Sequence, residues 1–194
     1  MLKRICVFCG SNTGARAAYV EAAENLGKLL AKRGIGLVYG GGKVGLMGKI
    51  ADSVMASGGE VIGVIPQSLM RKEIAHAGLT DLRVVDSMHQ RKALMAELSD
   101  GFIALPGGFG TFEEICEIVT WAQLGLHAKP CGILNVEGYY DHLLGLFDHA
   151  VAEKFLRPEN RALVIASKSP TEMLNHLTNY KVPHVEKWIT PETV

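Results

Sequence analysis

The sequence predicts an α/β protein with a three-layer, Rossmann-like fold, in which a mostly parallel sheet of about seven strands is flanked by helices. Two features of the chain support this prediction. Short apolar runs alternate with longer segments of helical spacing, which is the pattern of βαβ units. The runs are apolar at nearly every position, as expected for parallel strands that are covered on both faces.

Each predicted strand is a short run rich in Val, Ile and Leu, and glycine or polar residues follow it. None of these runs is long enough to be mistaken for a helix of ordinary length. The predicted strands cover residues 5–8, 36–39, 61–65, 82–85, 102–105, 131–134 and 163–166.

The helices are predicted from apolar residues that recur every three or four positions. In residues 15–32, Tyr19, Ala22 and Leu26 fall on one face, and Gly34 ends the helix. Residues 66–78 follow no regular pattern. The other predicted helices cover residues 46–57, 88–98, 111–124 and 139–152, and a last one opens at Pro170 and Thr171.

The length and charge of the chain limit what it can be. Its 194 residues, 48% of them hydrophobic, suffice for one domain with a full core. We expect a single α/β domain at residues 1–181 and a C-terminal arm or tail at residues 182–194. With 20 basic and 20 acidic residues, the chain has no basic stripe for nucleic acid. The apolar run before Gly10 is too short for a signal peptide or a membrane span, so we expect a cytoplasmic location.

Cys6 and Cys9 form a CxxC pair within the first apolar run. Residues three apart on a strand point to opposite faces, which does not suit a redox pair. No second CxxC or HxxxH is present to complete a zinc site. We therefore interpret these cysteines as buried, reduced thiols.

The seven histidines are scattered, and only His142 and His149 share a helical face. Two ligands are too few for a typical metal site, so we expect no metal and no other cofactor. The methionines at positions 47, 55, 88 and 95 fit core and pocket wall better than a cofactor site.

A first glycine-rich turn covers residues 40–45, after the second predicted strand. Gly40, Gly42 and Gly45 match GxGxxG, but the next strand ends without the acid that a dinucleotide site needs for the ribose. The Walker pattern fails as well, because Val44 follows Lys43. We interpret the turn as a mononucleotide or substrate loop with Gly41, Gly42 and Gly45 as binding residues. The alternative is a tight turn with no role in binding.

The second glycine-rich turn, residues 106–114, is more specific. It combines a proline, three glycines, a threonine and an acid that falls within the following helix. Helix N-termini attract phosphate, and glycine lets a ligand approach the backbone closely. Thr111 and Glu114 also have capping-box spacing, so Glu114 could instead serve only to cap the helix.

These motifs resemble one family. PGGFGTFEE at residues 106–114 matches the PGGxGTxxE pattern of the Lonely Guy family of cytokinin-activating phosphoribohydrolases. The stretches FCGSN at 8–12, GGGKVGLMG at 40–48 and MHQRK at 88–92 are similar to that family too, and the resemblance spans about residues 4–180. Members are often labelled lysine decarboxylases, but no His-Lys pair of the pyridoxal kind occurs here.

The resemblance implies a nucleotide-binding domain that hydrolyses a purine nucleoside 5′-monophosphate to free base and ribose 5-phosphate. It leaves open whether the base is adenine or an N6-isoprenoid adenine. It also implies a homodimer, and Ile115, Ile118 and Trp121 make the helix at 111–124 apolar on more than one face. By position, the resemblance places catalytic roles on Arg91 and Glu114 and nucleotide binding on Glu73, Arg91, Lys92, Gly108, Phe109, Gly110, Thr111, Phe112, Glu113, Glu114 and Thr120.

The chemistry of these residues suits such a reaction. A carboxylate near the anomeric carbon stabilises an oxocarbenium-like state or activates water, and Glu114 would lie in the first helical turn. The guanidinium of Arg91 can hold phosphate or help the base to leave. Phosphate should bind the N–H groups of Gly108, Gly110 and Thr111. Met88, next to this site, could line a base pocket.

Three alternatives remain at this point. Lys92 could belong to a solvated helix face, and Glu73 could be an ordinary surface acid in the charged segment at 71–73. The whole domain could be a nucleotide-binding module without turnover. A redox enzyme that uses NAD is disfavoured by the missing acid.

Overall fold

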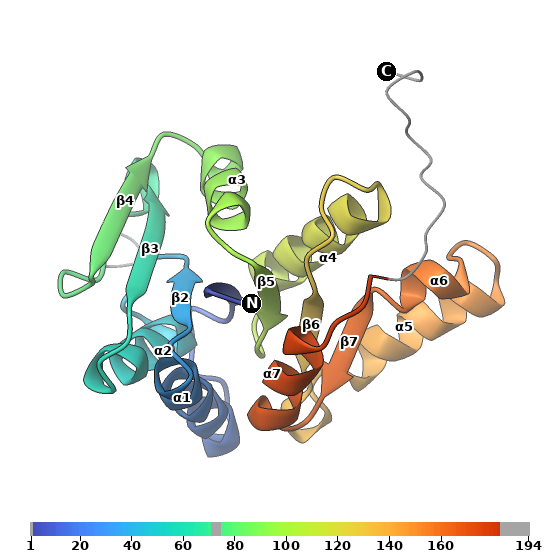
Figure 1. The fold of residues 1–194 in the computed structure, drawn as a ribbon, viewed down its shortest axis with the longest axis horizontal. Coiled ribbons are helices and arrows are strands. Elements are labelled where there is room, and N and C mark those ends of the chain that lie inside the picture. Colours follow the sequence, from blue (N-terminus) through green and yellow to red (C-terminus); the bar gives the residue numbers. More distant parts are fainter. Residues whose placement is uncertain (1, 71–74, 183–194) are drawn as a thin grey trace.

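The computed structural model of the protein describes residues 2–70 and 75–182. It contains a seven-stranded sheet with the order β4-β3-β2-β1-β5-β6-β7, in which every neighbouring pair is parallel (Figure 1). The three-layer α/β fold is therefore confirmed, and the sheet is parallel throughout. The strands are β1 Arg4–Phe8, β2 Gly36–Tyr39, β3 Val61–Pro66, β4 Asp81–Val85, β5 Gly101–Ala104, β6 Cys131–Leu134 and β7 Val164–Ser167.

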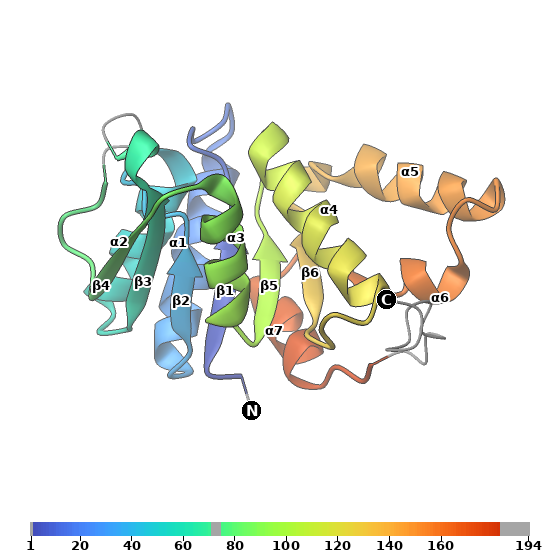
Figure 2. The ribbon, with the colours of Figure 1, turned by 90° about the horizontal axis from the view of Figure 1, so that it is seen from above.

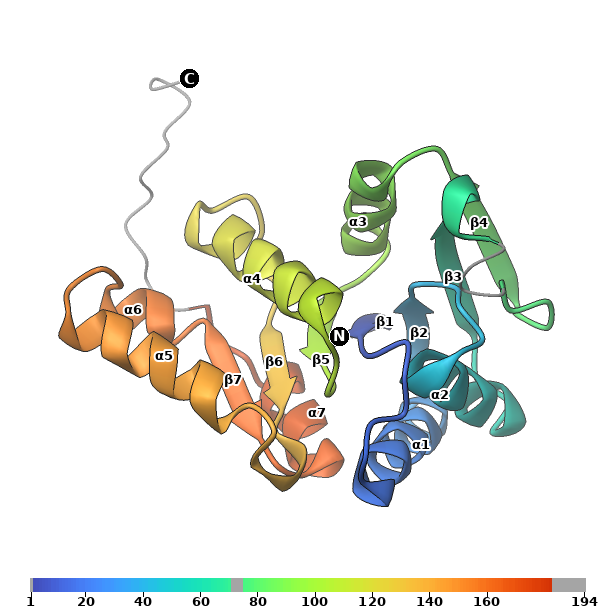
Figure 3. The same cartoon turned by 180° about the vertical axis from the view of Figure 1, so that it is seen from behind.

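The helices cover both faces of this sheet (Figure 3). Helices α1, α2 and α7 pack in one apolar cluster on one face, and α3, α4 and α5 pack in a second cluster on the other. Within β1, Ile5 and Val7 belong to the first cluster and Cys6 and Phe8 to the second, as the alternation of a strand requires. The helices are α1 Ala17–Lys32, α2 Gly45–Ala56, α3 Met88–Glu97, α4 Phe109–Gln123, α5 Asp141–Ala152, α6 Pro158–Arg161 and α7 Pro170–Thr178.

All seven predicted strands and all six predicted helices are present, and most boundaries differ by one or two residues. Gly34 follows the end of α1 with a φ of +66°, the left-handed conformation that ends many helices. The four-residue helix α6 and two short 3₁₀ helices, Gln67–Leu69 and Val136–Gly138, were not predicted, because such short segments carry no periodicity.

The topology places a switch point beside β1. The chain moves from β1 to β2 and β3 on one side and returns to β5 and β6 on the other. The loops after β1 and β5 therefore run apart at the carboxyl ends of adjacent strands, where open α/β sheets bind their ligands (Figure 2). Every helix in residues 2–70 and 75–182 is too short or too polar to cross a lipid bilayer.

Candidate active site

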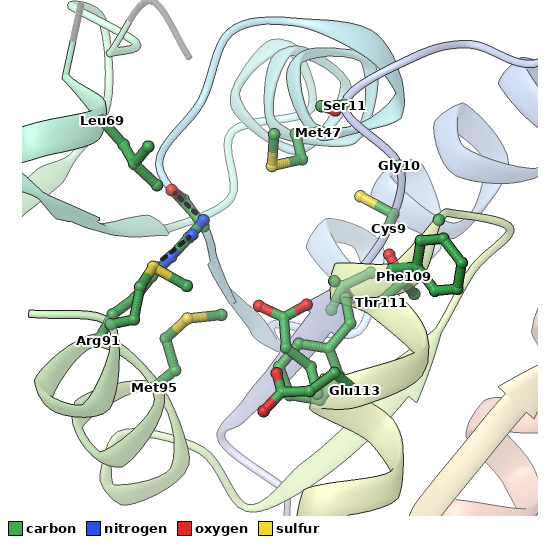
Figure 4. Close-up of a pocket in the computed structure, with 17 residues that line it drawn as sticks. Cys9, Gly10, Ser11, Met47, Leu69, Arg91, Met95, Phe109, Thr111 and Glu113 are labelled. Carbon is green, nitrogen blue, oxygen red and sulfur yellow. Dashed lines mark hydrogen bonds between the residues drawn. The ribbon is translucent and has the colours of Figure 1, made fainter. Parts of the chain in front are cut away.

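A cavity of about 280 Å³ opens at the switch point, between α3 and the N-terminus of α4 (Figure 4). It brings together segments that are far apart in the sequence: the loop after β1, the end of β2, helix α3 and the second glycine-rich turn. The residues that line it are Val7, Phe8, Cys9, Gly10, Ser11, Gly40, Met47, Leu69, Met88, Arg91, Met95, Gly108, Phe109, Gly110, Thr111, Glu113 and Glu114.

Arg91 is the buried cation of this cavity, with only 5% of its surface exposed. Its Nε donates to the carbonyl of Val64 at 3.1 Å, and its Nη2 donates to the carbonyl of Gly40 at 2.9 Å. Its Nη1 lies 3.8 Å from the sulfur of Met88 (Figure 4). These contacts fix the guanidinium at the carboxyl ends of β2 and β3, so the residue enters the site already oriented.

The N-terminus of α4 forms the facing wall, and its start corrects one prediction. The helix begins at Phe109, with Gly108 at the N-cap and no capping side chain. Thr111 is therefore inside the helix, with 3% of its surface exposed, and the predicted cap by Thr111 was wrong. The reason is that glycine reaches the N-cap conformation without a side chain, so the helix starts before the first polar residue. The capping-box explanation of Glu114 fails with it.

Glu113 and Glu114 both line the cavity from α4. Counted from Phe109, Glu114 is in the second turn, and the first turn holds no acid. Our placement of Glu114 in the first turn was wrong, and the pull of the helix dipole on it is correspondingly weaker. Glu114 lines the cavity together with Val7 and Phe8 of β1. Burial, and then the negative charge of Glu114, raise the pKa of Cys6 and of Cys9.

Lys92 follows Arg91 on α3 but does not line the cavity. Only 9% of its surface is exposed. Its Nζ lies 2.5 Å from Oε1 of Glu113 and 2.9 Å from Oε1 of Glu117, both on α4. The alternative in which Lys92 belongs to a solvated helix face is therefore wrong.

The remaining candidates on α4 lie apart from the cavity or at its rim. The side chain of Phe112 packs against Tyr139 and Tyr140 instead of the cavity. Phe109 is 91% exposed, and its ring lies on the side of the turn away from Arg91 (Figure 4). Thr120 is exposed, donates to the carbonyl of Cys116 at 2.7 Å and lies outside the cavity.

The first glycine-rich turn contributes Gly40 to the cavity, but Gly41, Gly42 and Gly45 do not line it. Gly41 and Gly45 have φ values of +76° and +61°, which favour glycine for conformational reasons alone. Gly45 also lies against the backbone of Ser11 and Asn12, where a Cβ would clash. A role of these three glycines in binding stays a prediction, and a packing role is evident for Gly45.

Several lining residues were not among the predicted site residues. Leu69 is one of them; it forms an apolar wall around Arg91 with Met47, Met88 and Met95, which were expected as core or pocket wall and of which only Met88 was predicted to bind substrate. Cys9 and Ser11 line the cavity from the loop after β1. Their position after a strand at a switch point was the available signal. Glu73 lies outside the described residues.

All four cysteines are free thiols. Cys6 in β1 and Cys9 just after its end are buried, as predicted for this pair, and they pack in the two different apolar clusters on opposite faces of the sheet. In the part of the chain that the structure describes, no cluster of His, Cys, Asp and Glu could hold a metal ion. No lysine of this described part lines the cavity either.

Comparison with known proteins decides the family. A family model described as "Possible lysine decarboxylase" matches residues 47–177. The cytokinin riboside 5′-monophosphate phosphoribohydrolase LOG1 of Arabidopsis thaliana is 53% identical over 185 residues, which cover 95% of this chain and 86% of that protein. The chain belongs to the Lonely Guy family. A second Lonely Guy protein, the phosphoribohydrolase LOG of rice (Oryza sativa subsp. japonica), is 50% identical over 95% of this chain and 76% of its own length.

Solved structures share the fold at lower identity. The molybdenum cofactor binding protein of Rippkaea orientalis has a TM-score of 0.70 and 22% identity, covering 92% of this chain and 96% of its own. The molybdenum cofactor carrier protein of Chlamydomonas reinhardtii also has a TM-score of 0.70, with 19% identity and coverage of 92% and 97%. At such identities the likeness concerns the fold alone.

Proposed function

We propose that this protein hydrolyses the N-glycosidic bond of purine nucleoside 5′-monophosphates, with adenine or N6-modified adenine as the base, and releases the free base and ribose 5-phosphate. Its relatives of about 50% identity are named for this reaction on cytokinin riboside 5′-monophosphates. One observation of the structure carries the proposal. Arg91 on α3 and Glu114 on α4 line a single cavity beside an open helix N-terminus.

The phosphate binds at the N-terminus of α4, on the N–H groups of Gly108, Gly110 and Thr111. The first N–H groups of a helix have no partner within it, and the dipole favours an anion there. A Cβ added to Gly108 or Gly110 would meet no atom within 4 Å, so these glycines leave open space for a ligand. Within residues 2–70 and 75–182, no packing contact excludes a side chain at either position, although Gly108 also serves as the N-cap of α4.

With phosphate on α4, the sugar lies beside Glu114 and the base faces α3. Glu114 accepts a proton from water as the water oxygen bonds to the anomeric carbon, or stabilises the positive charge on the sugar. The bond from the anomeric carbon to the base nitrogen breaks, and its electron pair leaves with the base, which then takes up a proton. Arg91 faces the departing base with its positive charge, and the wall of Met47, Met88 and Met95 provides its apolar surroundings.

The active protein is a homodimer in this proposal, joined through the outer surface of α4 and α5. Although α5 is rich in apolar residues, none of its residues is fully buried. An apolar groove of about 290 Å³ runs between α4, α5 and α6, and Phe155 at its edge is 90% exposed. Thr120 lines this groove, about 14 Å along the helix from Thr111. If Thr120 contacts nucleotide, it does so in the partner's cavity.

Light scattering during size-exclusion chromatography tests the dimer. We expect twice the 21.0 kDa of the chain, and Phe155→Asp should shift the mass to that of the monomer. A single species of one chain mass for the unmodified protein would contradict it. We also place the protein in the cytoplasm, since its four cysteines are free thiols, and cell fractionation tests that location.

The function is tested by measuring ribose 5-phosphate released from AMP and from isopentenyladenosine monophosphate. We expect release by the wild type and, because Glu114 acts on the reacting atoms, a loss of at least about a hundredfold in kcat for Glu114→Ala with nucleotide binding retained. Glu97→Ala, an exposed acid at the end of α3, is the control. The ratio of the two substrates identifies the preferred base. Binding without release from either nucleotide would favour the non-catalytic binding module instead.

A further inference from the structure

Two buried cations follow one another on α3 and connect to different walls of the cavity. Arg91 donates to backbone carbonyls near the ends of β2 and β3. Lys92 turns to the other side and pairs with Glu113 and Glu117 of α4. Glu113 lines the cavity, whereas Lys92 and Glu117 lie behind it. The lysine therefore joins the two helices that enclose the cavity.

Burying the ammonium of Lys92 is energetically unfavourable unless its carboxylate partners are present. The side chain of Lys92 is only 10% exposed, and its burial alone would lower its pKa, but the hydrogen bonds with Glu113 and Glu117 raise the pKa above the ordinary lysine value. Glu117 is 26% exposed, and its second oxygen is buried without a hydrogen-bond partner. Removing the lysine would leave this partly buried carboxylate uncompensated.

The same contacts argue against Lys92 as a direct ligand of the nucleotide. Two of the three donors of its ammonium are used by carboxylates at 2.5 and 2.9 Å, and the residue does not line the cavity. To reach a phosphate at the N-terminus of α4, Nζ would have to break its ion pairs with both carboxylates. Glu113, in contrast, is 53% exposed at the cavity and has one oxygen with no partner among the described residues.

We propose that Lys92 is a positioning residue: it holds one oxygen of Glu113 against α3 and so presents the other to the sugar hydroxyls of the nucleotide. This inference rests on the proposed function. A carboxylate is an acceptor of the kind that a ribose diol needs, and its two oxygens can serve two different donors. Glu117 keeps the ammonium in place from behind, one helical turn further along α4.

The test compares the affinities for AMP and for 2′-deoxyadenosine 5′-monophosphate, measured by calorimetry. All variants carry Glu114→Ala, so that nucleotide is bound without turnover. In that background we expect AMP to bind about tenfold more tightly than the deoxynucleotide, as one charge-assisted hydrogen bond predicts. Both Lys92→Met and Glu113→Gln should reduce this ratio to about two or less, and Lys92→Arg should restore most of it.

A double-mutant cycle completes the experiment. Because Lys92 acts through Glu113, we expect Lys92→Met to change AMP affinity by no more than about twofold once Glu113→Gln is present. If the losses of AMP affinity caused by Lys92→Met and by Glu113→Gln multiply in the double variant, the proposal is overturned. It is also overturned if Lys92→Met keeps the full preference for AMP over the deoxynucleotide. Lys129→Met is the matched control, since Lys129 Nζ donates to a backbone carbonyl of α3, that of Ala96, at 2.8 Å.

Two further arms separate this inference from folding and from the proposed function. If Lys92→Met does not fold, Lys92→Met with Glu117→Leu removes the buried charge as well and leaves Glu113 without its cation. Wild-type protein that binds AMP but releases no ribose 5-phosphate would refute the proposed hydrolysis while the binding cycle still reports on Lys92. If the wild type releases ribose 5-phosphate but Lys92→Met and Glu113→Gln have additive effects on the free energy of AMP binding, only the proposed role of Lys92 is refuted.

Discussion

The carbonyl of Gly40 and the guanidinium of Arg91 give the sharpest test of how the site is built. A Cβ at position 40 would overlap Nη2 of Arg91 and come within 3.1 Å of its Cζ. Gly40 does not have a positive φ, so Gly40→Ala introduces no backbone strain. The substitution should therefore chiefly displace the guanidinium, and it also brings the new methyl group within 3.3 Å of the Met47 sulfur, at the flexible end of that side chain.

The size of the effect follows from the overlap. Carbon atoms pack at about 3.5–4.0 Å, so the end of Arg91 must move by about 1 Å or more. The 2.9 Å hydrogen bond to Gly40 is then lost, which should lower the free energy of unfolding by about 1.5–3 kcal/mol. A misplacement of about 1 Å in a catalytic group can reduce turnover about a hundredfold, and we expect that loss in kcat/KM for AMP.

The assay is ribose 5-phosphate release by Gly40→Ala, by Arg91→Ala and by the double variant, with urea unfolding of each. We expect Gly40→Ala to cost little in activity once Arg91 is already alanine, because the new methyl group then has space. Nearly wild-type activity of Gly40→Ala would refute the reasoning. So would losses that multiply in the double variant, since they would show that Gly40 acts independently of Arg91.

Three further outcomes are expected. Since the pKa of Lys92 is raised, its stabilising effect is complete below the ordinary value of 10.5 and is lost as the pH rises through the raised value. In urea unfolding at increasing pH above 10.5, the free energy of unfolding should therefore fall more for the wild type than for Lys92→Arg, and an equal loss would contradict this. Burial raises the pKa of Cys131 to about 12 and also raises the pKa of Cys6 and of Cys9, so these three thiols should not react with iodoacetamide at pH 8. Mass spectrometry should therefore find no more than one adduct per folded chain, on Cys116, which is only partly buried. Gly145→Ala should raise Tm by about 2–4 °C, because Gly145 lies in the interior of α5 and the new Cβ would have no atom within 4 Å. A lower Tm would show that this face of α5 is more crowded than it is in the monomer.

The fold was predictable because its signals are local. Runs such as Cys131–Leu134, buried on both faces, and helices with one apolar face each carry their own periodicity. The start of α4 was misplaced because a glycine can occupy the N-cap, and glycine in a PGGxG stretch gives no mark of where the helix begins. The parallel order of the strands followed from the alternation of strands and helices.

The site was predictable only in part. The motifs placed Arg91, Glu114 and the second glycine-rich turn at one cavity, and the structure brings them together. The pairing of Lys92 with Glu113 and Glu117 depends on how α3 and α4 face each other across β5, which no local pattern encodes. Met47 and Leu69 likewise reach the cavity through tertiary packing.

The glycines of the two turns differ in the space around them. Gly107 in the second turn, like Gly40 and Gly45 in the first, leaves no room for a side chain, whereas Gly108 and Gly110 face open space. A side chain at Gly40 would strike Arg91, and one at Gly45 would strike the backbone of the loop after β1, so these glycines make room for the protein itself. A side chain at Gly108 or Gly110 would meet no atom within 4 Å. Glycine has a lower helix propensity than alanine, and no packing contact among the described residues accounts for it at Gly110 in the first turn of α4. The phosphate that we propose at this helix N-terminus would supply a reason, because a methyl group at Gly110 would intrude on its approach.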